Sequence, residues 1–214
     1  MHCPRCGTAL QTADSPALDL CPACLLAAAL STDGAPCPYR IVAPIAESRT
    51  GTTYLAQPSG RARGFVALKF FAMRDDVDEV LARYDRWKAP LARVAHGGVA
   101  RLLDVGLTDE GLVYAASQFV AGWPLATIDD RPSIGPDARV EIARQLSATV
   151  GAIHAAGVAH LALTASNVRV SATSGVQATI LGLGIRLIID GADASPDADR
   201  RALEHLHRQL GLAS

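Results

Sequence analysis

Four cysteines near the amino terminus have the spacing of a metal site. They form two pairs, Cys3 with Cys6 and Cys21 with Cys24, in the pattern C-x2-C-x14-C-x2-C. Two thiolates three residues apart can bind one ion from a single tight turn, and two such pairs complete a tetrahedral four-sulfur site. Because the protein fills all four positions, the metal would be structural rather than catalytic. Zinc fits this pattern best, and the alternatives are a dithiol redox pair or an iron site of rubredoxin type.

Folding of the segment that binds this metal would also depend on the metal. The residues between the two pairs are too few and too polar to bury a core, so metal binding would supply the folding energy, on the order of 10 kcal/mol. We therefore predict a zinc ribbon over residues 1–30. Residues 31–38 contain Asp33-Gly34 and two prolines, which are typical of a linker, and Cys37 among them is expected to be a lone thiol.

Composition excludes several classes of partner. The chain of 214 residues has 20 basic and 21 acidic side chains, so no net field would attract the phosphates of a nucleic acid. Its longest apolar runs, such as 25–30 and 185–189, are far shorter than the roughly 20 residues of a membrane-spanning helix. The first residues lack the basic and apolar regions of a secretion signal, and we expect a cytoplasmic protein.

After the linker, short apolar stretches alternate with helical patterns. Five stretches bounded by glycine, proline or polar clusters predict strands, the first three as an antiparallel meander and the last two as a hairpin. Apolar residues at helical spacing predict three helices, and two brief strands separate the second helix from the third. The fold class is α+β with two lobes, a five-stranded antiparallel sheet and then a helical lobe that holds a small hairpin. In order, the predicted elements are strands 39–46, 52–57 and 65–71, helix 75–88, strands 101–107 and 112–119, helix 136–156, strands 168–170 and 177–181, and helix 195–212.

Particular residues mark the ends of these helices. Pro90 is expected to end or kink the first helix, because proline lacks a backbone donor. Ser195, in the run Ser195-Pro196-Asp197, is expected to cap the third helix, and Gly211 to end it. The third helix carries leucines on one face, which predicts an amphipathic helix docked on a core.

Three segments of the chain resemble signature regions of protein kinases, and they occur in the same order as in that family. Two further stretches, 114–125 and 153–158, resemble the hinge and the approach to the catalytic loop in bacterial serine/threonine kinases. The likeness covers nearly all of residues 39–214 and implies a kinase-like domain there, with a truncated helical lobe, behind the zinc ribbon. The three segments are Thr50-Gly51-Thr52-Thr53-Tyr54-Leu55-Ala56, Val66-Ala67-Leu68-Lys69 and His160-Leu161-Ala162-Leu163-Thr164-Ala165-Ser166-Asn167.

The resemblance assigns a nucleotide site to Lys69, Gly51 and Asn167. Lys69 matches the lysine that contacts the phosphates of ATP, and Gly51 matches the last glycine of the phosphate loop. The two earlier glycine positions are Ala46 and Ser48, so side chains stand where backbone amides should approach phosphate. A tryptophan, Trp87, also stands where the glutamate partner of the lysine is expected. We therefore expect weak phosphate binding, with residual ATP binding left open.

At the positions that carry catalysis in the family, the residues of this chain differ more from the family pattern. The resemblance assigns the base that accepts the substrate proton to Ala162, and the magnesium-binding aspartate to Gly182. Alanine cannot accept a proton, and losing a general base costs about 100- to 10,000-fold in rate. Asn167 keeps the second metal position, but an amide without a neighbouring carboxylate is a poor site for magnesium. His160 is expected to be a buried structural imidazole rather than a replacement base.

The end of the chain is shorter than the family pattern. The stretch after Gly182-Leu183-Gly184 is brief and lacks the Ala-Pro-Glu of kinase activation segments. Asp199 matches the aspartate that opens the central helix of the kinase lobe, and little of the chain follows it. The lobe is therefore predicted to be truncated, which would leave apolar surface for a protein partner or for self-association.

These features predict a catalytically inactive pseudokinase that serves as a regulatory or scaffolding module. One alternative is an active serine/threonine kinase that uses displaced residues, with Asp190 and Asp193 as candidate carboxylates. A second alternative is a zinc-ribbon protein that binds nucleic acid. His2 and Arg5 are the basic side chains close to the cysteine pairs, and no aromatic platform for bases accompanies them.

Overall fold

The computed structural model describes residues 37–48, 50–59, 64–71, 76–173 and 175–212. These residues divide into two compact units. The sheet unit comprises residues 37–77 and Leu103–Phe119, and the helical unit comprises Asp78–Leu102 and residues 120–212. The predicted zinc ribbon lies outside the described residues.

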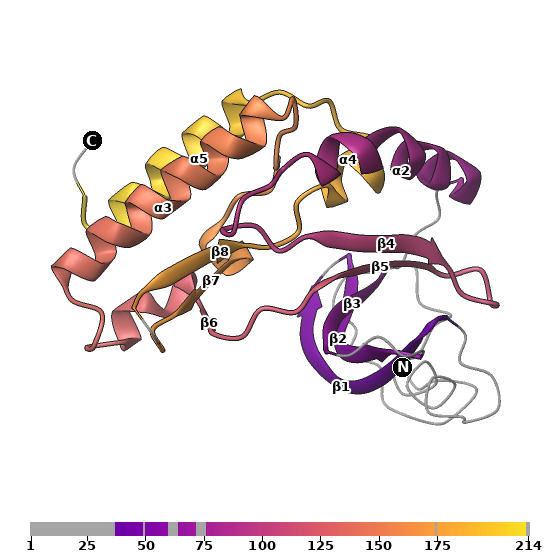
Figure 1. Ribbon diagram of the computed structural model, residues 1–214, viewed down its shortest axis with the longest axis horizontal. Helices are drawn as coiled ribbons and strands as arrows, with labels where there is room; N and C mark the ends of the chain where they lie inside the picture. Colours follow the sequence, from indigo (N-terminus) through magenta and orange to yellow (C-terminus); the bar gives the residue numbers. More distant parts are fainter. Residues whose placement is uncertain (1–36, 49, 60–63, 72–75, 174, 213–214) are drawn as a thin grey trace, which may run out of the picture. The chain divides into compact units, whose positions relative to one another are not determined.

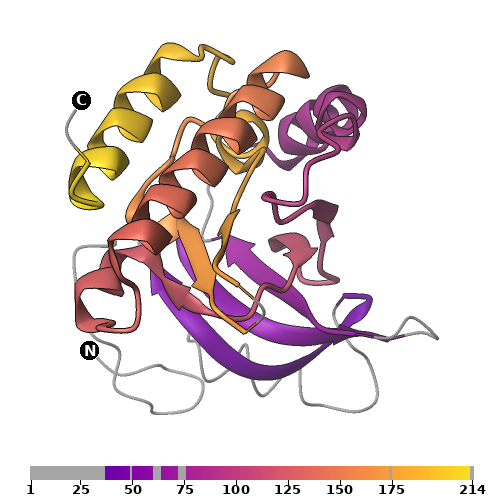
Figure 2. The same ribbon diagram turned by 60° about the vertical axis from the view of Figure 1, so that its left-hand side comes forward.

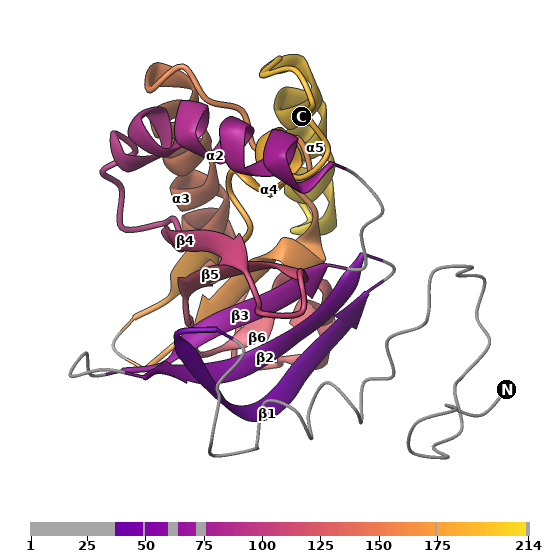
Figure 3. The same cartoon turned by 90° about the vertical axis from the view of Figure 1, so that its right-hand side faces the viewer.

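The sheet unit contains one five-stranded sheet with the strand order β1-β2-β3-β5-β4 (Figure 3). The first three strands pair antiparallel in sequence order, and β3 also pairs antiparallel with β5. A hairpin joins β4 to β5, where the backbone N–H of Thr108 donates to the carbonyl of Leu112 at 2.9 Å. The predicted meander and hairpin are both confirmed. The strands are β1 (Tyr39–Ser48), β2 (Gly51–Pro58), β3 (Val66–Phe71), β4 (Leu102–Leu107) and β5 (Val113–Gln118).

Side chains alternate between the two faces of β3, and this alternation positions its lysine. Val66, Leu68 and Phe70 are buried in a core that also includes Tyr54 of β2. Lys69 lies between two of these buried residues and therefore projects from the opposite face of the sheet. The alternation of side chains along the strand thus decides on which face the ammonium group lies.

Raised pKa values in this core predict a loss of stability at alkaline pH. Burial raises the pKa of Cys37, Tyr54 and Tyr114, and for Tyr114 the hydrogen bond from its hydroxyl to Asp104 Oδ2 at 3.0 Å raises it further. Above pH about 9 the unfolded chain ionises first, so the stability present below that pH declines by up to about 1.4 kcal/mol per pH unit per group.

This decline can be measured by urea unfolding between pH 8 and pH 11, alongside phenolate absorbance at 295 nm. Tyr114 is expected to ionise together with unfolding of the sheet unit, and Tyr114→Phe should reduce the slope of stability against pH. Ionisation of all the tyrosines near pH 10 in a protein that stays folded would contradict the expectation.

The helical unit packs two long helices side by side (Figures 1 and 2). Helix α3 (Pro136–Ala155) and helix α5 (Asp197–Gln209) confirm two of the predicted helices. Gly157, which follows α3, and Gly211, the predicted end of the third helix, both have positive φ angles. Beside the helices is a three-stranded sheet in the order β6-β7-β8, so the predicted small hairpin gains a third strand. Its strands are β6 (Trp123–Pro124), β7 (Val168–Ser171) and β8 (Gln177–Ile180).

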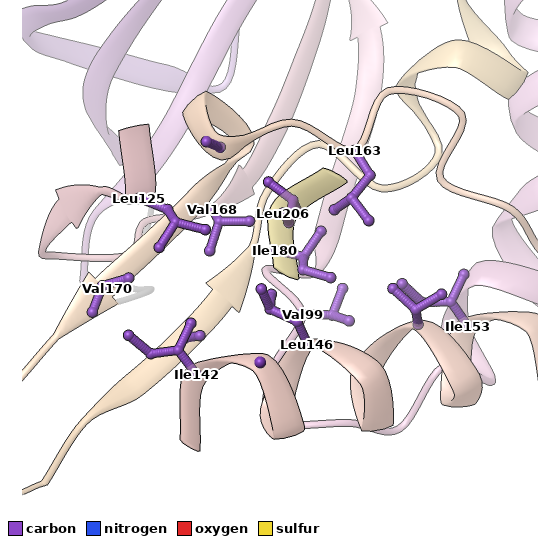
Figure 4. Packing of buried hydrophobic residues seen from close by; sticks show 14 of the residues in the cluster. Val99, Leu125, Ile142, Leu146, Ile153, Leu163, Val168, Val170, Ile180 and Leu206 are labelled. Carbon is purple, nitrogen blue, oxygen red and sulfur yellow. The ribbon is translucent and has the colours of Figure 1, made fainter. Parts of the chain in front are cut away.

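The core of the helical unit lies between α3 and this small sheet. Ile142, Leu146 and Ile153 of α3 point toward Ile180 of β8 and the other labelled aliphatic side chains in Figure 4. All four are essentially inaccessible to solvent. Val140 of the same helix instead lies on the outer side of α3 and is 51% exposed.

Two predicted helix ends differ from the structure. Helix α2 (Val77–Ala92) continues through Pro90. The backbone bond that proline removes would have gone to the carbonyl of Arg86, an exposed residue, which limits its cost. Helix α5 begins after Pro196, and no side chain caps it, so the predicted cap by Ser195 is wrong.

Several short helical elements were absent from the prediction. These are the 3-10 helices η1 (Leu125–Asp130) and η2 (Ala165–Asn167) and the single-turn helix α4 (Ile185–Ile188). None is long enough to display a helical repeat of apolar residues. In the part of the chain that the structure describes, no helix could cross a bilayer.

Exposed large hydrophobic side chains lie mainly in the sheet unit. The outer face of α5 is polar, with Arg200, Glu204 and Arg208 exposed. Of the described residues in the helical unit, Val140 is the one large hydrophobic that is exposed. The exposed large hydrophobic residues of the sheet unit are Val42, Ile45, Phe65, Leu103 and Leu107.

Candidate functional site

The turn between β1 and β2 holds the ammonium group of Lys69. Lys69 Nζ donates to Thr50 Oγ1 at 2.7 Å and to Ser48 Oγ at 3.3 Å. The same nitrogen lies 5.1 Å from the centre of the Phe71 ring, which is a cation–π distance. The sheet unit therefore brings together two of the predicted nucleotide-site residues, Lys69 and Gly51, at one turn.

The backbone around residue 51 leaves room only for glycine. It has a φ of 138°, and a Cβ atom at this position would lie 1.8 Å from the carbonyl oxygen of Phe70. No side chain fits between β2 and β3 here. The close approach of the two strands explains this glycine without any bound phosphate, so its presence does not by itself indicate a nucleotide site.

His160 begins the loop of the helical unit that the resemblance assigned to catalysis. Its ring is buried, and Nε2 lies 2.8 Å from the carbonyl oxygen of Leu181. The backbone N–H of Ala162 donates to Nδ1 at 3.3 Å. Burial lowers the pKa of His160, so the ring is neutral and donates through Nε2. Because the remaining lone pair is already used, His160 is a structural imidazole, as predicted.

The same loop brings the other predicted positions together. Asn167 Nδ2 donates to the carbonyl oxygen of Ala162 at 2.7 Å. The backbone N–H of Leu181 donates to the carbonyl of Asn167 at 2.7 Å, and Gly182 follows it in sequence. The three positions Ala162, Asn167 and Gly182 therefore belong to one backbone network, and none of them carries a carboxylate.

This set of groups does not fit a magnesium site. Magnesium in proteins is bound through carboxylates, and one amide beside backbone groups is a poor substitute. Among the described residues, no group of three histidine, cysteine, aspartate or glutamate side chains could hold a metal ion. The predicted zinc ligands Cys3, Cys6, Cys21 and Cys24 lie outside the described residues.

Asp199 of α5 is the centre of hydrogen bonding in this loop, a role that the sequence analysis missed. It is 1% exposed. Its Oδ2 accepts the backbone N–H of His160 at 2.7 Å and lies 3.0 Å from His154 Nε2, while Oδ1 accepts the N–H of Leu161 at 2.7 Å. Leu161 has a φ of 66°, an unfavourable value for leucine. The carboxylate thus holds a strained loop residue in place.

A sequence signal for this role was present. Asp199 lies four residues before Leu203 and seven before Leu206, on the face of α5 that packs into the core. A carboxylate on the apolar face of an amphipathic helix must be buried, and a buried carboxylate needs several donors.

Arg83 of α2 fixes the segment that follows Gly182. Its Nε donates to the carbonyl of Ile188 at 2.7 Å and its Nη2 to that of Ile189 at 3.0 Å, at the end of α4. Nη1 lies 3.3 Å from Glu79 Oε1, and the side chain is 14% exposed. All three guanidinium nitrogens therefore have partners, and α4 is tied to α2.

Replacing Arg83 with alanine is expected to loosen this segment. Two buried carbonyls would lose charged donors, which should lower the free energy of unfolding by about 2–3 kcal/mol. Hydrogen–deuterium exchange of the peptide 186–192 should become faster than in the unsubstituted protein. Arg86→Ala, an exposed arginine on the same helix, is the matched control, and equal exchange in the two variants would refute this role.

Comparisons with known proteins find similar serine/threonine-protein kinases. No protein-family model matches the chain. The chain is 28% identical over 167 residues, 76% of its length, to the serine/threonine-protein kinase pkn3 of Myxococcus xanthus. It is 27% identical over 161 residues, 73% of its length, to pkn2 of the same organism. The chain spans 30% of the length of pkn3 and 19% of the length of pkn2.

Solved structures with the same fold are kinase domains. The PknI kinase domain of Mycobacterium tuberculosis matches with a TM-score of 0.63 and 27% identity, covering 81% of this chain and 72% of that domain. A double mutant of the same domain matches with a TM-score of 0.65 and 25% identity over the same shares. The protein thus has a kinase-like fold, and its homologues are bacterial serine/threonine protein kinases.

Proposed function

We propose that the protein is a catalytically inactive pseudokinase that acts as a regulatory or scaffolding module. The observation that carries this proposal is the lack of a proton acceptor in the loop of His160, Ala162 and Asn167. The methyl group of Ala162 cannot act as a base, and the lone pair of His160 already accepts the N–H of Ala162. Without a base or a magnesium carboxylate, phosphoryl transfer loses two groups on which kinase chemistry depends.

The test is transfer of labelled phosphate from ATP to a general protein substrate. The protein is expected to incorporate no more label than its Lys69→Ala variant. Incorporation above that level would overturn the proposal and favour an active kinase with displaced residues. Of the two candidates for that role, Asp190 forms an ion pair with Arg186, and Asp193 is exposed.

Restoring the missing carboxylates would identify the cause of inactivity. Gly182 has a φ of 80°, which aspartate tolerates better than most residues, and a Cβ atom there meets nothing within 4 Å. The variant Ala162→Asp/Gly182→Asp can be compared with Ala162→Asn/Gly182→Asn, which has nearly the same shape without the charge. Activity in the first variant and not in the second would assign the defect to these two positions.

We also propose that the sheet unit keeps residual, magnesium-independent ATP binding, through Lys69 and the turn that holds Gly51. Support comes from the ammonium group at that turn and from the kinase homologues. ATP without magnesium should raise the thermal midpoint, and saturation at 100 times the dissociation constant would add about 2.7 kcal/mol. A shift that appears only with magnesium would contradict the expected loss of the metal site.

The spacing of the cysteines supports a structural zinc ribbon in front of this domain. One zinc ion per chain is expected, bound by Cys3, Cys6, Cys21 and Cys24. Metal analysis of the purified protein should show loss of the ion after Cys6→Ser/Cys24→Ser. A scaffolding role also requires a protein partner or a second copy of this chain, and light scattering would reveal the latter.

A further inference from the structure

The side chains of Ser48 and Thr50 form a closed hydrogen-bond network with Lys69. An ammonium group only donates, so both hydroxyl oxygens accept from Lys69 Nζ, at 3.3 Å and 2.7 Å. Ser48 Oγ donates to the carbonyl oxygen of Gly51 at 2.9 Å. Ser48 Oγ also lies 3.1 Å from Thr50 Oγ1. Because the proton of Ser48 is already donated to Gly51, Thr50 is the donor between these two hydroxyls. Every hydroxyl proton has an acceptor in this arrangement.

The network gives the turn a chemical character opposite to that of a phosphate loop. A loop of glycines presents backbone N–H donors to an anion. Here the described side chains of the turn, Ser48 and Thr50, present hydroxyl oxygens as acceptors to the ammonium group of Lys69, which a phosphate oxygen would also contact. The protein's own side chains therefore take the place of phosphate oxygens around Lys69.

We infer that Ser48 and Thr50 are specificity-determining residues that compete with the phosphates of a nucleotide for Lys69. This inference rests on the residual ATP binding proposed above. These hydroxyls accept two of the three N–H donors of the ammonium group, so a nucleoside triphosphate that contacts Lys69 through more than one oxygen competes with them, whereas a nucleoside without phosphates meets no such competition. The two hydroxyls thus weaken triphosphate binding selectively.

The decisive variant, Ser48→Ala/Thr50→Val, removes both hydroxyls, and valine keeps the branched shape of threonine. Titration calorimetry with ATP, without magnesium, is expected to show binding about three- to tenfold tighter than in the unsubstituted protein, the range of one charged hydrogen bond that is partly exposed to solvent. Adenosine, the matched ligand without phosphates, should bind equally well to both proteins. The gain should vanish when Lys69→Ala is added, and an unchanged thermal midpoint without ligand confirms an intact fold.

The other outcomes separate the two proposals. If the unsubstituted protein binds ATP and the double variant binds it no more tightly, the competition is refuted while residual ATP binding stands. An equal gain for adenosine and ATP would also refute it, because the effect would not involve phosphate. If neither protein binds ATP at any concentration tested, residual nucleotide binding fails, and the inference fails with it.

Discussion

Replacing Asp199 with alanine is expected to lower the free energy of unfolding of the helical unit by about 3–5 kcal/mol. The substitution leaves the backbone N–H groups of His160 and Leu161 without an acceptor and removes the partner of His154. Removing one member of a buried charged network costs this much because its hydrogen-bond partners, two of which are backbone groups fixed in the fold, are left unpaired. Leu161 would also lose the bond that holds its positive φ angle.

Urea unfolding followed by tryptophan fluorescence measures this effect, because Trp87 and Trp123, the two tryptophans of the chain, both lie in the helical unit. Asp197→Ala is the matched control. Asp197 lies on the same helix but is exposed, in an ion pair with Arg200, and its loss should change stability by less than about 0.5 kcal/mol. If Asp199→Ala loses less than about 1 kcal/mol, Asp199 is not the centre of this loop.

The second large effect is expected for Gly51→Ala in the sheet unit. The new methyl group would lie 1.8 Å from the carbonyl oxygen of Phe70, and the residue would have to keep a φ of 138°. Since the obstacle is backbone, relief requires that β2 and β3 move apart at the pair of Gly51 with Phe71. We expect a loss of at least about 3 kcal/mol, the sum of backbone strain and overpacking.

Gly64→Ala separates strain from steric conflict. Gly64 also has a positive φ, 111°, but a Cβ atom there meets nothing within 4 Å, so this variant should lose only about 1–2 kcal/mol. Hydrogen–deuterium exchange of peptides from β2 and β3 reports on the sheet unit directly. Equal protection in the two variants would mean that the contact of Gly51 with Phe70 is not what requires this glycine. A loss of ATP binding with stability unchanged would instead assign Gly51 to the ligand.

Local patterns predicted the long elements well, because each depends on residues close in sequence. A short apolar stretch bounded by glycine and polar residues identified β3, and helical spacing identified α3 and α5. The strand β6 was missed since it has two residues and exists only by pairing with β7. Helix α4 was missed for a similar reason, as its last carbonyls are held by Arg83, a residue more than a hundred positions earlier in the chain.

For the candidate site, too, some features follow from the sequence and others only from the structure. Sequence alone determined its chemical content: alanine at position 162, glycine at 182, a lysine on the third strand, and four cysteines in paired spacing. It also determined that no carboxylate stands at Ala162 or Gly182. These are properties of residue types, which need no coordinates.

Only the tertiary structure decided what each group bonds to. It assigned Asp199 to backbone donors 38 and 39 residues away, Lys69 to two hydroxyls about 20 residues away, and Gly51 to a close approach of neighbouring strands. The physical reason is that hydrogen bonds and steric contacts act over a few ångströms, so their partners are set by how distant segments meet. Residue type limits which interactions can form, and the fold selects among them.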